Sequence, residues 1–269
     1  ETPEQVLEFL RGLAHRCSPF VVADRTEMIV WARQHLGYQT LEPWDLAFVA
    51  EKIRQRKYAF SEQEVKQYFT EPTVLSGLFH LIETLYGLRF VKSEAPAWHP
   101  DVSYYELKNA DGSLAGGLYL DLYARTGKQG GAWMNNLVDQ SHLLARRPVV
   151  TNNLNIVKPP AGQPTLLTWG EVNTLFHEFG HALHGLLSST RYASQSGANT
   201  PRDFVEFPSQ VNEMWSLDPD LLRRYAVHHV TGEPIPDEWV SDLKAAELFD
   251  QGFATTELLA ASILDQAWH

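Results

Sequence analysis

Cysteine, long apolar runs and basic charge are all scarce in this sequence. The single cysteine, Cys17, cannot form a disulfide within the chain, which predicts a reducing compartment and a cytoplasmic location. No apolar run approaches the ~18 residues that a membrane-spanning helix needs. Because 22 Lys and Arg face 33 Asp and Glu, the formal net charge is −11, which argues against nucleic acid and membranes as partners. The remaining composition is typical of a globular protein.

Neither end of the sequence has the features expected of a natural terminus. The chain begins with Glu1 instead of Met, and residues 1–17 carry charges that predict an amphipathic helix and not a secretory signal. It stops at His269, within an apolar stretch around Leu258–Leu264 that predicts a helix still in progress. We therefore interpret the sequence as a fragment of a longer protein.

The hydrophobic pattern changes twice, which predicts a mainly α fold with a small antiparallel sheet. Residues 1–88 have apolar positions at helical spacing, residues 89–168 carry short aromatic and β-branched runs, and residues 169–269 return to a helical pattern. No linker or internal repeat separates these three regions. We expect them to form one partial catalytic domain.

Within these regions, individual elements can be placed. Asp111-Gly112 indicates a hairpin between two predicted strands, 102–107 and 117–124. Residues 148–151 and 165–167 are candidate additional strands. Helices are expected near 43–57, 62–69 and 71–87.

One predicted helix carries the motif HExxH. Thr168 and Glu171 have the spacing of a capping box, so the helix is expected to start there. His177 and His181 are four residues apart and therefore lie on one face. Their nitrogens can approach the ~3.4 Å separation that tetrahedral zinc ligands need. The motif predicts one Zn²⁺ per chain, with Glu178 beside it as the general base.

The residues after the motif exclude one class of zinc enzyme. The metzincin pattern requires Gly at position 184 and His at position 187, and the chain has His184 and Leu187 there. His184 falls near the ligand face of the predicted helix. It is a candidate for substrate binding, with a plain polar position on the wall of a cleft as the alternative.

A glutamate from a second helix is the remaining candidate for the third ligand. Thr200 as the cap and Pro201 as the first helical residue predict such a helix, with Glu206 one turn further in. Glu213 is a rival ligand later on the same segment. Asp203 is expected either to cap the helix or to orient a ligating histidine through its free ring nitrogen.

These motifs together resemble a known family. The run Leu175–His184, followed by Glu206 25 residues after the second histidine, is similar to the thimet-oligopeptidase family (M3) of zinc peptidases. Within that family, Ser196–Gln210, His99–Val102 and Gly130–Asn135 most resemble the bacterial peptidyl-dipeptidases of the Dcp type. The oligopeptidase A type is the nearest alternative.

The resemblance implies a largely helical fold with a deep channel and zinc at its floor. It implies that His177, His181 and Glu206 bind the zinc ion and that Glu178 is the general base. The family also uses a His and Tyr residues on a Gly-rich downstream segment, which would lie beyond His269. The resemblance thus implies that N- and C-terminal parts of the family chain are absent here.

The sequence gives weaker signals for the residues that contact a substrate than for the metal ligands. We expect peptide backbone to pair with an exposed strand edge, with Gly116–Ala124 as the candidate. Gly130, Gly131 and Ala132 are candidates to present backbone NH groups to the peptide, with a simple turn as the alternative. Lys128 and Arg202 are candidate cations for a substrate's terminal carboxylate, or else ordinary surface charges.

The sequence therefore predicts zinc-dependent hydrolysis of short peptides, with release of C-terminal dipeptides. One alternative is an endopeptidase of the oligopeptidase A type. Another is a zinc-binding fragment without turnover, because the downstream His and Tyr segment is missing. A protein that keeps the zinc fold only for binding is disfavoured, since such a site has no need of Glu178. The sequence does not predict an oligomeric state.

Overall fold

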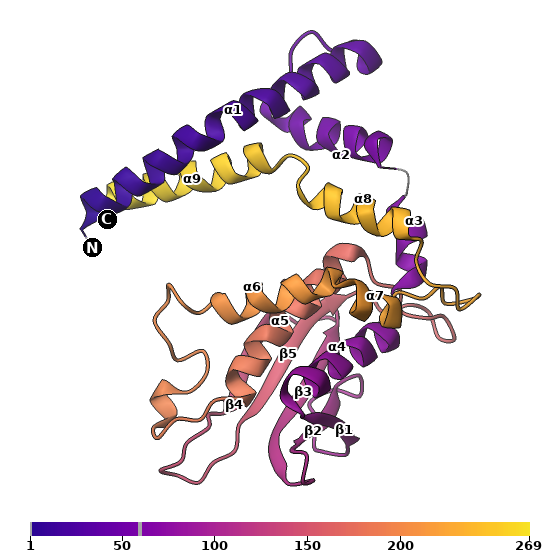
Figure 1. The fold of residues 1–269 in the computed structure, drawn as a ribbon, viewed down its shortest axis with the longest axis vertical. Helices are drawn as coiled ribbons and strands as arrows, with labels where there is room; N and C mark the ends of the chain where they lie inside the picture. Colours follow the sequence, from indigo (N-terminus) through magenta and orange to yellow (C-terminus); the bar gives the residue numbers. More distant parts are fainter. Residues whose placement is uncertain (1, 59–60) are drawn as a thin grey trace. The chain divides into compact units, whose positions relative to one another are not determined.

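The computed structural model describes residues 2–58 and 61–269 of the chain (Figure 1). These residues form two compact units. One consists of the described part of Glu1–Ser61 together with Pro236–His269, and the other is Glu62–Ile235. The HExxH motif lies in the second unit, which therefore carries the candidate site.

The first unit is built from helices. Thr2 caps the first of them with the reciprocal bonds to Gln5 that define a capping box, and Gly37 ends it in the left-handed conformation. This long helix runs alongside the last one (Figure 1). A β-carbon at Gly252 would lie 2.8 Å from the Phe20 carbonyl carbon, so glycine permits their close crossing. The elements are α1 (Pro3–Leu36), η1 (Pro43–Asp45), α2 (Leu46–Lys57), α8 (Asp237–Glu247) and α9 (Gln251–Trp268).

The helix predicted near 43–57 is confirmed as η1 and α2. The α1–α2 corner buries a small apolar core made of Met28, Ala32, Val49 and Ile53. Among the described residues, no helix combines the length and the apolar character needed to cross a bilayer.

The second unit contains a five-stranded sheet with the order β1-β2-β3-β5-β4. The hairpin predicted at Asp111-Gly112 is confirmed, because β2 and β3 pair antiparallel on either side of it and Gly112 has φ +82°. The segment 165–167 forms only an isolated bridge from Leu166 to Thr70. The strands are β1 (Arg89–Ser93), β2 (Ser103–Lys108), β3 (Leu114–Tyr123), β4 (Trp133–Val138) and β5 (Val149–Ile156).

The predicted antiparallel sheet is wrong at one pair, because β3 and β5 run parallel, from Gly117 opposite Val149 to Tyr123 opposite Ile156. After β3 the chain forms the edge strand β4 and returns as β5, which inserts between β3 and β4. Successive strands alternate in direction, so placing β5 beside β3 makes that pair parallel. Turn signals in the sequence specify only the pairing of consecutive strands, and the sheet is therefore mixed.

Helix α5 (Trp169–Leu186) packs on this sheet, against β3, β4 and β5 (Figure 1). The predicted capping box is confirmed: the Glu171 amide donates to Thr168 Oγ1 at 3.2 Å, and the Thr168 amide donates to Glu171 Oε2 at 2.8 Å. Most apolar side chains of α5 are buried, as a helix between a sheet and a second helix requires. They are Val172, Leu175, Phe176, Phe179, Ala182, Leu183 and Leu186.

The second unit contains further helices besides α5. The segments predicted near 62–69 and 71–87 are confirmed as α3 with η2 and as α4. Helix α7 packs against α4, and α6 packs against α5. Their bounds are α3 (Glu62–Val65), η2 (Lys66–Tyr68), α4 (Glu71–Tyr86), η3 (Ala193–Gln195), α6 (Phe207–Glu213), η4 (Met214–Leu217) and α7 (Pro219–Tyr225).

The start of α6 differs from the sequence prediction. Thr200 and Pro201 do not open a helix, and residues 202–206 form turns instead. Glu206 is the residue that precedes the first turn of α6, and Pro208 lies within that turn. Proline is tolerated in the first turn, where its missing NH is not needed, but it disrupts a helix interior. A helix begun at Pro201 would place Pro208 in its interior, so the helix begins after Glu206.

Candidate metal centre

The two histidines of the motif lie one turn apart on α5, and both side chains are partly exposed. Their ring centroids are 4.9 Å apart and their planes are nearly perpendicular, at 82°. Burial lowers the pKa of His181 below its usual value, against the attraction of the nearby Glu206 carboxylate. A neutral imidazole has a free lone pair, which is the form that binds a metal.

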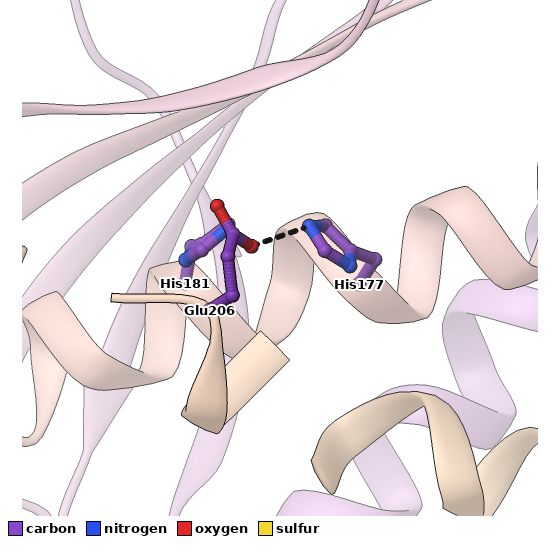
Figure 2. Close-up of side chains that lie close together, drawn as sticks. All are labelled: His177, His181 and Glu206. Carbon is purple, nitrogen blue, oxygen red and sulfur yellow. Dashed lines mark ion pairs between the residues drawn. The ribbon is translucent and has the colours of Figure 1, made fainter. Parts of the chain in front are cut away.

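Glu206 brings a carboxylate to these two histidines from outside α5 (Figure 2). Its Oε2 lies 3.2 Å from Nε2 of His177 and 3.1 Å from Nε2 of His181. One ligand atom from each residue lies within 4.8 Å of the other two. Tetrahedral zinc ligands are ~3.4 Å apart, so the three groups fit one small cation with little movement. Two imidazoles and one carboxylate are also a donor set typical of zinc sites that keep an open position.

The third feature of the site is a carboxylate behind His177. Glu213, near the end of α6, accepts a hydrogen bond from His177 Nδ1 through Oε1. The other oxygen of Glu213 accepts a bond from Asn173 Nδ2 at 3.4 Å, and the Asn173 side chain accepts one from Ser216 Oγ at 3.2 Å. With the proton on Nδ1, Nε2 of His177 presents its lone pair towards Glu206.

The structure thus brings Glu213 into contact with His177 on the side opposite to Glu206. Asp203, considered from sequence for orienting a histidine, is an exposed residue in the turns before α6. From the sequence, Glu213 is predicted only as a rival ligand, and Asn173 and Ser216 are not predicted as site residues. A signal for Asn173 exists, since it precedes His177 by one helical turn and shares its face.

Glu178 differs from the other carboxyl groups of the site because its side chain is buried. The residue is 6% exposed, and its Oε2 has no hydrogen-bond partner among the described residues. Burial raises the pKa of this carboxyl above its usual value, while His177 opposes the rise and Glu206 adds to it. A carboxylate with a raised pKa and an unused oxygen is suited to accept a proton.

Close approach of α5 and α6 holds these groups together. A β-carbon at Gly180 would lie 2.6 Å from Ser209 Cα and 2.7 Å from the Pro208 carbonyl oxygen, so only glycine fits between the two helices. Asn212 Nδ2 donates to the Phe176 carbonyl at 2.6 Å, which ties α6 to the middle of α5. Gly180, one of the two variable positions of HExxH, is therefore needed for the packing of α6 on α5.

His184 lies one turn beyond His181 on α5 and is outside the three-residue group. Its ring meets the Phe204 ring edge-on at 6.4 Å, and burial lowers its pKa. Gly130 and Gly131 form a bend that leads through Ala132 into β4. The bend is held by Asn155, whose Nδ2 donates to the Gln129 and Gly131 carbonyls at 2.7 Å.

Two expectations about substrate contacts are wrong. Strand β3, which contains most of Gly116–Ala124, is paired on both sides by β2 and β5 and therefore offers no free edge. The edge strand beside α5 is β4. Lys128 is buried: its ammonium group donates to Asp121 Oδ1 at 2.9 Å and also to the Leu154 carbonyl. The ammonium group of Lys128 is therefore used in contacts within the fold and is not free to bind a substrate's carboxylate. Arg202, by contrast, is exposed.

The sequence of the chain is similar to those of known peptidases. The model of peptidase family M3 matches residues 1–269. The chain is 45% identical to a dipeptidyl carboxypeptidase of Salmonella typhimurium and 37% identical to oligopeptidase A of Escherichia coli, in both cases over all of this chain and 40% of the relative. It is 30% identical to a mitochondrial intermediate peptidase of Neurospora crassa, over 39% of that protein. The chain thus spans about two fifths of the length of these relatives. It belongs to peptidase family M3.

Proposed function

We propose that the protein hydrolyses peptide bonds in short oligopeptides, using one Zn²⁺ held by His177, His181 and Glu206. The observation that carries this proposal is the convergence of two imidazole nitrogens on a single carboxylate oxygen, at 3.2 and 3.1 Å. Bound zinc supplies Lewis acidity, which polarises a carbonyl group and makes water more acidic. We also propose that the chain is one part of an M3 catalytic domain.

Other groups of the chain would transfer the proton, orient a ligand and bind the peptide. Glu178 accepts a proton as water attacks the scissile carbonyl and then delivers it to the leaving amine. Its burial favours both steps, because a carboxyl with a raised pKa is a better acid–base catalyst near neutral pH. Glu213 orients His177 through Nδ1. The open edge of β4 beside α5 is where extended peptide backbone can pair.

Release of C-terminal dipeptides is the favoured specificity. The relatives named dipeptidyl carboxypeptidase share 45% and 43% of residues with the chain, compared with 37% for oligopeptidase A. An endopeptidase with the same zinc chemistry is the second candidate. The third is a zinc-binding fragment without turnover, which a comparison of this chain with the full-length protein distinguishes.

The test of the metal site is elemental analysis of the full-length protein, where we expect about one zinc per chain. Glu206→Ala removes a ligand, and Glu213→Ala removes only the hydrogen bond behind one. We therefore expect Glu206→Ala to weaken zinc binding more than the roughly 10- to 100-fold expected for Glu213→Ala. Asp203→Ala is the matched control and should retain zinc. Absence of tightly bound zinc would refute the proposal, and the reverse order of the two glutamates would make Glu213 the third ligand.

A further inference from the structure

Ser209 is fully buried in the first turn of α6, directly behind the Glu206 carboxylate. Its hydroxyl lies 2.9 Å from Glu206 Oε2 and 2.8 Å from the Glu206 backbone carbonyl oxygen. Oε2 is also the atom that faces both histidines. The hydroxyl therefore contacts the oxygen on which the geometry of the site depends.

One hydroxyl proton cannot fully serve two acceptors, and the two acceptors differ. The Glu206 carbonyl already accepts the ordinary helical bond from the Gln210 amide at 3.0 Å. The carboxylate oxygen is charged, and hydrogen bonds to ionised acceptors are the stronger ones. The proton of Ser209 is therefore better used on Oε2 than on a carbonyl that already has a partner.

Glu206 has few other constraints. Its side chain is 53% exposed, and it extends from a residue that precedes the helix. A long, exposed side chain has many accessible rotamers, and fixing one of them opposes metal binding. A buried donor on a rigid first turn removes part of that freedom in advance.

We propose that Ser209 is a positioning residue, whose hydroxyl holds the Glu206 carboxylate over His177 and His181 before the metal binds. The proposal rests on the proposed zinc site. Gly180 is part of the same arrangement, because its missing side chain lets the Ser209 backbone approach α5. Metal affinity, and not only activity, should then depend on a hydroxyl that is not itself a ligand.

The experiment measures the dissociation constant for Zn²⁺ by chelator competition in the full-length protein. We expect Ser209→Ala to weaken binding by roughly 10-fold or more, the effect typical of lost contacts behind a ligand. The control is Ser196→Ala, which removes an equally buried hydroxyl that has no hydrogen-bond partner among the described residues. It should change the constant less than about twofold.

A double-mutant cycle separates positioning from packing. In a Glu206→Ala background, Ser209→Ala should have no further effect on zinc affinity, because the carboxylate on which it acts is gone. Thermal unfolding of the metal-free variants monitors the fold, and Ser209→Gly removes the same hydroxyl should Ala disturb the helix contact.

The outcomes distinguish the two proposals. If the wild-type protein does not retain zinc, the proposed function fails. If the wild type retains zinc and Ser209→Ala binds it equally well, the positioning role is refuted and the zinc site remains. If Ser209→Ala still weakens binding in the Glu206→Ala background, Ser209 acts through helix packing and the positioning role is refuted as well.

Discussion

At the scale of single residues, environment gives three glutamates around one helix different chemistry. Glu178 is buried with an unpartnered oxygen, Glu206 is half exposed and faces two imidazoles, and Glu213 bonds to the far side of one of them. The side chains are chemically identical. Solvent exposure and the neighbouring nitrogen are what separate the roles proposed for them, as base, metal ligand and orienting group.

The first prediction concerns the base. In the full-length protein, Glu178→Gln should retain zinc and lose turnover by about 10²-fold or more, because the amide cannot accept the proton. Zinc content and the rate of cleavage of a quenched peptide are measured on the same sample. Near-normal turnover with zinc bound would show that another group activates the water.

The second prediction concerns pH and Asp250. Burial, followed by the charges of Asp24 and Glu27, raises the pKa of this carboxyl to about 6. The folded state therefore holds the proton more tightly than the unfolded state, whose carboxyl ionises near the ordinary value of ~3.9. The contribution of Asp250 to the free energy of unfolding is therefore fully present below pH ~3.9 and is lost as the pH rises through about 6.

Asp250→Asn should remove this pH dependence. Asp250 has φ +60°, a conformation that asparagine also tolerates, so the backbone should be unaffected. The unfolding temperature of the variant, relative to wild type, should rise between pH 4 and pH 8. Glu257→Gln, at an exposed carboxyl within α9, the helix that Asp250 precedes, is the control and should show no such rise. Parallel curves for Asp250→Asn and wild type would contradict the prediction.

At the scale of elements, the candidate site depends on how closely α6 approaches α5. Two features of the sequence determine that contact: glycine within the HExxH motif and proline two residues after Glu206. Gly180 has no side chain to keep the two helices apart. Pro208 is compatible only with the first turn of a helix, so α6 begins directly after Glu206. The proposed third ligand, Glu206, is therefore the last residue before α6.

The third prediction tests this contact. Gly180→Ala would place a β-carbon 2.6 Å from a backbone atom of Ser209, so we expect a loss of about 1–3 kcal/mol in the free energy of unfolding. Gly170→Ala is the matched control on the same helix, because a β-carbon there would lie 4.0 Å from Thr168 Oγ1, at ordinary contact distance. It should be neutral or stabilising by up to about 1 kcal/mol. Denaturant unfolding measures both, and equal effects would show that the helices separate easily.

At the scale of the whole molecule, the charges of the chain are divided between surface and interior. The chain has a net charge of −11, and most of its carboxylates are exposed. Asp121 and Lys128 differ because they form a buried pair. Arg125 and Trp98 also donate hydrogen bonds to Asp121. Burial opposes ionisation of Asp121, yet the bonds from Arg125, Trp98 and Lys128 hold its pKa well below the usual range. This pair is part of the fold beside β3 and β5, and the cation that would recognise a substrate's carboxylate must be sought elsewhere.

The fourth prediction concerns product size in the full-length protein. A peptidyl-dipeptidase must recognise the terminal carboxylate of its substrate, whereas an endopeptidase has no need to do so. We expect amidation of the C-terminus to abolish most cleavage and free peptides to be shortened by successive dipeptides, as mass spectrometry would show. Equal cleavage of the amide at internal bonds would establish the endopeptidase alternative.

The features that the sequence predicts correctly are those that depend on residues close together in the chain. Helix α5, its capping box and the shared face of His177 and His181 depend on residues within a few positions of one another, and all were predicted. The hairpin at Asp111-Gly112 is local in the same sense. Such features follow from backbone geometry and helical period, which the sequence states directly.

Other features depend on contacts between distant residues, and only the tertiary structure decided them. The parallel pairing of β3 with β5 requires β5 to insert beside a strand that is not its neighbour in sequence. The burial of Lys128 depends on Asp121 and on the Leu154 carbonyl, which lie on different strands. The different positions of Glu206 and Glu213 around His177 follow from where α6 begins and how closely it packs on α5. Spacing in a sequence fixes which side chains share a helix face, but packing between elements fixes which of them meet.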